Sequence, residues 1–415
     1  MMGCYLNPIS EGLQRSLRSQ IYVDKSLLIR ETNRLVRTNR RHVCLSRPHQ
    51  FGKTMAVDLL AAYYGCAADT RPMFDGLKIS QDSLFEDHLN RYDVIRVNMR
   101  MLSGYNPESN LNQLNAHIVN ELIQANRSIC FRNKKSLPQV MMDIFAATGR
   151  AFVILIDEWD CPLRENSFDQ RFWKLYLDYL RAWLKDQDYV ALAYMTGLMP
   201  VARYEAYSAL NMFSDYTMIN PGSLAPFFGF TEDEAAALCQ THGMPFDELR
   251  EWYGGYDLIE CRADGDVHHR MLHPRSAAEA LLRRKPAAYW VQGVECAAMK
   301  NYLATPNAYS SPSRWIQNAL QAGNAIERLL KGEHVEIDPA ISCRYQIDQE
   351  SRDEWLTLLV CLGYLALDAD SRSAFIPNRE AMRMIAEINN ICHEENPLIL
   401  PIDPLFPPDG IDPFL

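Results

Sequence analysis

The chain lacks the features that would place it in a membrane, in a secretory pathway or around a zinc ion. None of its 11 cysteines forms a Cys-x-x-Cys pair, and Cys261, His268, His269 and His273 match no metal-ligand spacing, which argues against a zinc ribbon. The amino terminus has no basic start, and the longest apolar runs fall short of the roughly 20 residues that cross a bilayer. An odd number of cysteines fits a reducing compartment. We therefore expect a soluble, cytoplasmic protein without a membrane partner.

Positive charge is scarce as well. The 415 residues carry a formal net charge of −10, a balance that does not indicate nucleic-acid binding over a broad surface. The hydrophobic content of 48% and charged content of 23% are typical of a globular protein. We interpret the cluster of Arg34, Arg37, Arg40 and Arg41 as a solvated helix face and linker.

The run Arg47-Pro-His-Gln-Phe-Gly-Lys-Thr54 is the most informative stretch that the chain does contain. It follows an apolar segment at 42–46 and opens a helix-like segment at 55–64, the order of a phosphate-binding loop. In such a loop, backbone N–H groups at the helix N-terminus point at a polyphosphate. Lys53 would reach the terminal phosphates and the Thr54 hydroxyl would bind Mg²⁺. The predicted nucleotide-binding residues are Arg47, Pro48, His49, Gln50, Phe51, Gly52, Lys53 and Thr54.

This loop lacks its usual first glycine. Arg47 stands at that position and does not adopt a positive φ cheaply. Pro48 follows and has no N–H to offer a phosphate. Because Gly-Lys-Thr alone also arises by chance, a turn without any ligand stays an alternative.

A second segment, Ala151-Phe-Val-Ile-Leu-Ile-Asp-Glu-Trp-Asp160, has the pattern of a buried parallel strand that ends in acids. Ligands of open α/β sheets bind at the carboxyl ends of the strands. Asp157 is therefore a candidate for holding Mg²⁺, directly or through water, and Glu158 for polarising an attacking water. The alternative is a core strand that ends in a solvated turn.

A third segment, residues 189–197, is another buried-strand pattern, and it ends in Thr196 and Gly197. Thr196 is our candidate for sensing the γ-phosphate, and Arg203 in the following helix would contact phosphate charge. A strand-end threonine and a solvated arginine are the alternatives. The predicted catalytic residues are thus Lys53, Glu158, Thr196 and Arg203.

Strands alternate with helices over the first half of the chain, which predicts an α/β fold with a mostly parallel sheet flanked by helices. A further strand is predicted at 93–98, and helices at 108–127, 136–147 and 168–185. The separation of Lys53 from Asp157 leaves room for an extra strand. From Thr231, which begins a capping-box pattern, the chain is predicted to be mostly helical. The expected units are a P-loop core at 1–230, a helical lid-like subdomain at 231–290, an α-rich domain with a small hairpin at 291–395 and an extended or disordered proline-rich tail at 396–415.

Several segments together resemble the predicted AAA-ATPase-like proteins of bacteria, P-loop NTPases that are often joined to a C-terminal nuclease domain of the PD-(D/E)xK type. Tyr22-Val-Asp-Lys-Ser26 is similar to the family's Tyr-Val-Asp-Lys-Thr, and 46–54 to its Arg-Pro-Arg-Arg-Phe-Gly-Lys-Ser loop. Leu155-Ile-Asp-Glu-Trp-Asp160 resembles its Ile-Asp-Glu-Tyr-Asp. Further matches are the stretch 210–217 after the sensor strand, Phe228-Gly-Phe-Thr231, Trp252-Tyr-Gly-Gly-Tyr256 and Ile376-Pro-Asn-Arg-Glu380.

The resemblance implies ATP and Mg²⁺ as ligands and makes the missing glycine a family habit, with the Arg47 guanidinium facing the phosphates instead. The chain departs from the family at His49-Gln50, where a basic pair is usual, and at Trp159, where tyrosine is usual. After Glu380 we find no Asp followed by Glu-x-Lys on paired strands, so we predict no nuclease activity.

Three functions remain open at this stage. The first is slow, Mg²⁺-dependent ATP hydrolysis in a regulatory or defence role. The second is a nucleotide-binding switch or scaffold with little turnover that controls a protein effector such as a nuclease. The third is a degenerate protein that binds no nucleotide. The preference for ATP over GTP rests on the resemblance, and the residues leave the target and the oligomeric state open.

Overall fold

A five-stranded parallel sheet forms the centre of the computed structural model, which describes residues 3–103, 106–165, 169–201, 209–290, 324–338 and 352–393. Arg203 and the segment 396–415 lie outside these residues, and the side chains of 355 and 387–393 are not described. The strands are β1 (His42–Ser46), β2 (Asp93–Asn98), β3 (Phe152–Asp157), β4 (Val190–Gly197) and β5 (Ser214–Tyr216). Their order is β2-β3-β4-β1-β5, so β4 separates the strand before the phosphate loop from the acidic strand.

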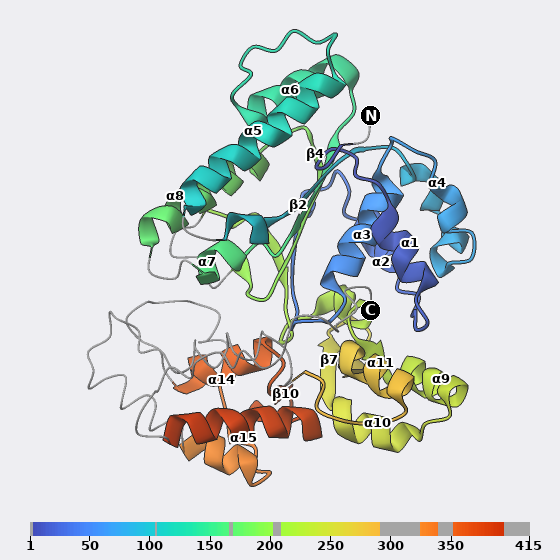
Figure 1. Cartoon of the computed structure of the whole chain (residues 1–415), viewed down its shortest axis with the longest axis vertical. Helices are drawn as coiled ribbons and strands as arrows, with labels where there is room; N and C mark the ends of the chain where they lie inside the picture. Colours follow the sequence, from blue (N-terminus) through green and yellow to red (C-terminus); the bar gives the residue numbers. More distant parts are fainter. Residues whose placement is uncertain are drawn as a thin grey trace, which may run out of the picture.

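Helices cover both faces of this sheet (Figure 1). One face carries α1 (Glu11–Arg18), α2 (Leu28–Asn33), α3 (Lys53–Tyr64) and α4 (Phe85–His88), and the other carries α5 (Pro107–Ala125), α6 (Leu137–Thr148), α7 (Cys161–Glu165) and α8 (Gln170–Leu184). Alternate side chains of β1 pack into the helix layers on the two faces of the sheet: Val43 and Leu45 belong to one apolar cluster, and Cys44 belongs to the other. Both faces are therefore apolar, which explains the continuous hydrophobic runs in the sequence.

Short 3-10 helices complete the first half, at Arg71–Met73, Lys78–Gln81, Met99–Leu102 and Gly222–Phe227. In the part of the chain that the structure describes, no helix is long and apolar enough to span a bilayer.

The next part packs below the sheet in Figure 1 and combines helices with an antiparallel sheet. It contains β6 (Phe230–Thr231), α9 (Glu232–His242), α10 (Phe246–Tyr253), β7 (Tyr256–Glu260), β8 (Val267–Leu272) and α11 (Pro274–Arg283). Thr231 caps α9 with the predicted capping box, in which its side chain and that of Glu234 each accept a hydrogen bond from the other's backbone N–H. Residues 267–272, which contain His268 and His269, form the second strand of the β7–β8 hairpin.

The last described part is called the C-terminal module here and comprises residues 324–338 and 352–393. It consists of a helix at 324–330, β9 (Val335–Glu336), α14 (Arg352–Cys361), β10 (Ala366–Asp368), β11 (Ser373–Phe375) and α15 (Arg379–His393). Its three strands form an antiparallel sheet in the order β10-β11-β9. The module contacts the preceding part through α15 on α10 and β10 on β7.

Candidate functional site

The segment between β1 and α3 has the backbone shape of an anion-binding loop. Gln50 and Gly52 both have positive φ, at 60° and 89°. A Cβ added at Gly52 would meet no atom within 4 Å, so the glycine is required for its conformation rather than for space. Such left-handed residues turn successive N–H groups toward one concave surface, directly ahead of the N-terminus of α3.

Lys53, the first residue of α3, closes this loop on itself. Its ammonium donates to the carbonyl oxygens of Arg47 and Pro48, at 3.0 and 2.8 Å, and the side chain is only 5% exposed. Burial lowers the pKa of Lys53, while the nearby carboxylates of Glu158 and Asp157 act in the opposite direction. The carbonyl oxygens balance the positive charge of the Lys53 ammonium only in part. A phosphate entering the loop would supply a full negative charge.

Asp157 lies fully buried at the end of β3 and accepts two side-chain hydrogen bonds. Thr54 Oγ1 donates to its Oδ2 at 2.8 Å, and Thr196 Oγ1 donates to its Oδ1 at 2.6 Å. Three segments that are distant in the sequence thus meet at one edge of the sheet, because β1, β3 and β4 run parallel. The Thr196 hydroxyl contacts this carboxylate. Its predicted role as a sensor of the γ-phosphate would therefore act through Asp157.

The donor set around Asp157 fits Mg²⁺. A hydroxyl oxygen and a carboxylate oxygen are hard ligands of the type that Mg²⁺ prefers, and Mg²⁺ commonly takes its remaining ligands from water and substrate phosphates. Among the described residues, there is no group of three or more His, Cys, Asp or Glu side chains that could hold a metal ion.

Glu158 follows at a tight turn, with a φ of 53° that is unusual for a residue with a side chain. Its Oε2 accepts a hydrogen bond from Arg164 Nη2 at 3.1 Å, and the same guanidinium donates from Nε to Asp160 Oδ2 at 2.8 Å. Burial, the largest cause, raises the pKa of Glu158, which is 8% exposed. The carboxylate is thus held in a defined position by a guanidinium that Asp160 anchors.

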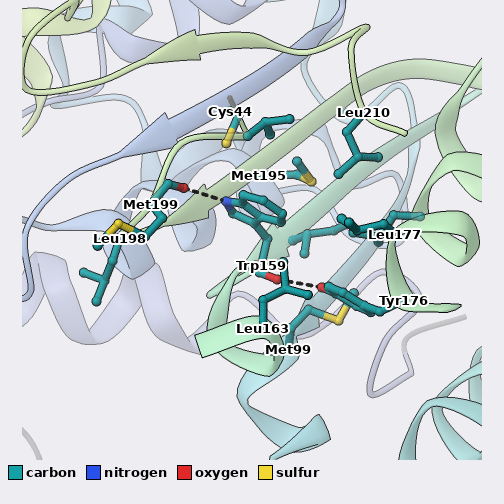
Figure 2. Close-up of a cluster of buried hydrophobic side chains, with 14 of the residues drawn as sticks. Cys44, Met99, Trp159, Leu163, Tyr176, Leu177, Met195, Leu198, Met199 and Leu210 are labelled. Carbon is teal, nitrogen blue, oxygen red and sulfur yellow. Dashed lines mark hydrogen bonds between the residues drawn. The ribbon is translucent and has the colours of Figure 1, made fainter. Parts of the chain in front are cut away.

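Trp159 fixes this turn in the core (Figure 2). Its backbone N–H donates to the carbonyl of Thr196 at 2.9 Å, and its indole Nε1 donates to the carbonyl of Met199 at 3.2 Å. The Tyr176 hydroxyl donates to the Trp159 carbonyl at 2.7 Å. The ring lies among apolar side chains that include Cys44, Leu163, Met195 and Leu198. The two neighbouring carboxylates differ: Glu158 borders the cavity described next, whereas Asp160 is fully buried and accepts from the backbone N–H groups of Leu198 and Met199.

A cavity of about 570 Å³ opens in front of the loop. Among the predicted nucleotide-site residues, its lining includes His49, Gln50, Phe51, Gly52, Lys53, Thr54 and Glu158. Asp157 and Thr196 lie behind Thr54 rather than on the surface of the cavity. Burial and the neighbouring cations lower the pKa of His49 to about 2, so this imidazole is neutral.

Arg47 and Pro48 lie away from the cavity, which differs from the expectation that Arg47 faces the phosphates. The Arg47 side chain is fully buried, its Nη1 donates to the carbonyls of Ser46 and Tyr216, and its guanidinium lies over the Phe228 ring. The physical reason is that β5 and the segment after it offer carbonyl oxygens and an aromatic face on the rear side of the loop. Arg203, the other predicted arginine, is outside the described residues.

Two walls of the cavity were not predicted from the sequence. One is the lead-in at 12–28, where Asp24 Oδ2 accepts from Lys78 N at 2.7 Å and Lys25 pairs with Glu234 at 2.6 Å. These contacts give the Tyr-Val-Asp-Lys motif a structural role. The other wall is α11, which contributes Arg275 and Glu279, a pair with an N–O distance of 3.0 Å.

Asn98 and Arg100 also border the cavity and were missed. Asn98 ends β2 in register with Asp157, so the rule that ligands bind at the carboxyl ends of strands would have found it. No sequence pattern marks Arg275, because its position depends on how α11 folds back over the sheet.

Residues 15–206 match the family model described as predicted AAA-ATPase. The match covers a little under half of the chain, and over this stretch the chain resembles the predicted AAA-ATPase family. The resemblance seen in the sequence is thereby confirmed, and with it a nucleotide-binding P-loop ATPase fold.

One curated relative is an uncharacterized protein in the vnfD 5′ region of Azotobacter chroococcum mcd 1, 28% identical over 226 residues. The match covers 52% of this chain and 42% of that protein, so the chain spans less than half of its relative's length.

Two solved structures are similar over most of their length at 12% identity. They are Cdc6p from Pyrobaculum aerophilum, with 93% of this chain and 94% of that chain covered at a TM-score of 0.28, and the Aeropyrum pernix ORC2 protein, with 91% and 97% covered at 0.39. Scores this low carry no argument about the site.

Proposed function

We propose that this P-loop ATPase domain binds ATP with Mg²⁺ in the cavity and hydrolyses it slowly. One observation carries the proposal: Lys53, Thr54 and Glu158 border the same cavity, and Asp157 is bonded to Thr54 directly behind it. These are the charges that phosphoryl transfer needs, namely a cation at the terminal phosphates, oxygen ligands for the metal and a carboxylate for the attacking water.

Another part of the cavity lining suits a base and ribose. The lead-in segment 19–23 and α11 contribute apolar surface there from Ile21, Tyr22 and Leu282. Clefts that combine apolar walls with a few polar groups are typical of small-molecule sites. We therefore orient the nucleotide with its phosphates on the loop and its base between the lead-in and α11.

The roles follow from charge and position. Lys53 offsets charge on the terminal phosphate, and Glu158 aligns and polarises water. Thr54 and Asp157 are the residues that would hold Mg²⁺, which supplies positive charge to the β- and γ-phosphate oxygens when bound. Thr196 fixes the orientation of the Asp157 carboxylate through their hydrogen bond. An arginine, from Arg203 or a neighbouring subunit, is proposed to complete the site.

Turnover tests the role of Glu158. In Glu158→Gln, phosphate release should fall by at least about 100-fold while ATP still binds, because the amide cannot accept a proton from water. The matched control is Glu108→Gln, which changes an exposed glutamate at the start of α5. Equal turnover by the wild type and Glu158→Gln would contradict the assignment.

Binding tests the role of the loop. ATP should raise the melting temperature of the wild type and of Lys174→Ala, an exposed lysine on α8, but not that of Lys53→Ala. An equal shift in all three proteins would remove Lys53 from the site. No shift in the wild type would favour the protein that binds no nucleotide.

A second candidate is a bacterial, cytoplasmic nucleotide switch that turns over little and controls a protein effector in regulation or defence. The hydrogen bond from Arg164 to Glu158 favours it, because a carboxylate engaged by a guanidinium is less available to water. A large ATP-dependent thermal shift without measurable phosphate release would select the switch, and steady turnover would select the ATPase.

A further inference from the structure

The nucleotide site leaves unexplained two segments that the sequence analysis singled out, Trp252–Tyr256 and Ile376–Asn378. They lie against each other, although more than a hundred residues separate them in the chain. Asn378 Nδ2 donates to the Gly254 carbonyl at 2.8 Å. Gly255 has a φ of 87°, and a Cβ added there would lie 2.2 Å from the Pro377 carbonyl oxygen. The C-terminal module is thus fastened to the end of α10 by close backbone contact.

The same module reaches the rear of the phosphate-binding loop. The Tyr256 hydroxyl donates to the Gly363 carbonyl at 2.7 Å, and the Tyr256 ring meets the Phe51 ring edge to face, with centroids 5.8 Å apart. A Cβ on Gly363, whose φ is 81°, would lie 2.7 Å from Cγ of Pro48. The loop and the module therefore approach each other too closely for any side chain at Gly363.

A row of rings makes a second connection. Phe51 meets His273 edge to face at 5.0 Å, His273 stacks on Trp290 at 4.7 Å, and Trp290 stacks on Tyr364 at 5.0 Å with an interplanar angle of 4°. All four side chains are buried, and the Trp290 N–H donates to the buried carboxyl of Glu380 at 2.7 Å. The row runs from the phosphate-binding loop to Tyr364 in the module, and the backbone N–H of Trp290 connects it to Glu380 on α15.

Phe51 is the shared element of both connections. It lies between Gln50 and Gly52, the residues whose positive φ values give the loop its shape. A well-packed ring limits the rotation of the backbone that carries it. The ring partners of Phe51, Tyr256 and His273, are in turn supported by the C-terminal module, through Gly363 and through Trp290 on Tyr364. A displacement of the module would therefore loosen the packing of Phe51 and change the directions of the loop N–H groups.

We propose that the C-terminal module is a positioning element of the phosphate-binding loop, so that nucleotide binding and docking of the module strengthen each other. The proposal rests on the proposed function, since it requires that the loop binds a nucleotide. Coupling of this kind is reciprocal: a module that holds the loop in its binding shape raises nucleotide affinity, and a bound nucleotide stabilises the docked module by the same factor.

The first test compares two aromatic-to-leucine variants of the module in the full chain. Tyr364→Leu removes the ring that stacks on Trp290. Phe375→Leu removes a ring that stacks on His334 within the module. Titration with a fluorescent ADP analogue should show affinity about 10-fold weaker in Tyr364→Leu and within about two-fold of the wild type in Phe375→Leu, in line with usual coupling energies.

A milder variant covers the case in which Tyr364→Leu does not fold. Tyr256→Phe keeps the ring against Phe51 and deletes only the hydroxyl that donates to Gly363. Loss of one buried hydrogen bond should weaken ADP binding by about 3- to 10-fold. Because Tyr256 lies outside the cavity lining, a direct loss of ligand contact does not explain such an effect.

Hydrogen exchange measures the reverse direction. Amides at 364–375 should exchange more slowly in the wild type with saturating ADP than without it, and this protection should shrink in Tyr256→Phe. A wild type that binds ADP tightly, with Tyr256→Phe and Tyr364→Leu binding equally well and exchange unchanged, would overturn the coupling and leave the proposed function intact. A wild type that binds no nucleotide would overturn both.

Discussion

The hydroxyl of Thr54 donates a hydrogen bond to Oδ2 of Asp157 across 2.8 Å. This contact joins the first turn of α3 to the end of β3. The strand that leads into α3 is β1, and β4 lies between β1 and β3 in the sheet. The two oxygens are close enough to share one small cation, and the Thr196 hydroxyl holds the carboxylate from its other side. The relationship therefore makes Mg²⁺ dependence a specific test of the site.

Asp157→Asn should abolish most of the gain in ATP affinity that Mg²⁺ provides. The amide has no negative charge for the cation, and its NH₂ group faces a threonine hydroxyl that donates in the wild type. ATP titrations with Mg²⁺ and with EDTA should differ at least about 10-fold in the wild type and less than about two-fold in the variant. Asp93→Asn, a buried acid at the start of β2, is the control that should keep the full difference. Full Mg²⁺ dependence in Asp157→Asn would place the metal elsewhere.

Arg275→Ala should weaken ATP binding by about 10-fold, the usual effect of losing one charge-assisted hydrogen bond. Arg275 lines the cavity from α11, whereas Arg283 pairs with the same Glu279, at 2.9 Å, without lining the cavity. Arg283→Ala therefore removes a comparable ion pair and should leave ATP affinity within about two-fold. Isothermal titration of both variants separates the two effects. Equal weakening in both variants would mean that ATP affinity depends on the ion pairs of Glu279 and not on the positive charge of Arg275 in the cavity.

Much of the parallel sheet was predictable because its strands are buried on both faces. The expected strands at 42–46, 93–98 and 189–197 agree with β1, β2 and β4 within a residue at each end, whereas the run at 151–160 extends three residues beyond the end of β3 at Asp157. Such strands appear as continuous apolar runs, and their carboxyl ends lie together by topology alone. For that reason the proximity of Lys53, Thr54, Asp157 and Glu158 could be predicted from their positions after the strands, without any knowledge of packing.

The features that escaped prediction depend on packing between distant segments. The β7–β8 hairpin was missed because its residues 268–270 are His, His and Arg, a polar pattern that is typical of a loop. The pair Asp264-Gly265 is a turn signal that could have indicated the hairpin, and Gly265 has a φ of 127°. The family resemblance implied that Arg47 faces the phosphates, yet Tyr216 and Phe228 hold it on the other side of the loop. The ring row through Trp290 and Tyr364 has no local sequence pattern at all.

Trp159→Ala should destabilise the protein by about 3–5 kcal/mol, the usual cost of removing a fully buried tryptophan. The change leaves a cavity in the cluster of Figure 2 and removes the donor to the Met199 carbonyl. Urea unfolding followed by circular dichroism should show a lower midpoint than in the wild type. Met101→Ala, which truncates an exposed apolar side chain, is the control and should stay within about 0.5 kcal/mol. A midpoint close to the wild-type value would mean that the core refills the space.

The carboxyl of Glu380 should make stability fall as pH rises toward neutrality. Burial raises the pKa of Glu380 to about 7 from an ordinary 4.5, even though it accepts a hydrogen bond from the backbone N–H of Trp290. Between these two values the folded carboxyl is protonated while the unfolded one is ionised, so the folded state binds more protons. The stabilising contribution is therefore complete below about pH 4.5 and is lost as pH rises through about 7.

Glu380→Gln isolates this effect, because the amide still accepts from the Trp290 N–H and does not titrate in this range. The stability of the variant relative to the wild type should increase by up to about 1.4 kcal/mol per pH unit across the window. Glu251→Gln, at a surface ion pair with Arg379, should follow the pH dependence of the wild type. Melting temperatures at about pH 5 and about pH 8 suffice. If Glu380→Gln and the wild type differ equally at both, the carboxyl is ionised throughout and its hydrogen bonds, rather than burial, set its charge.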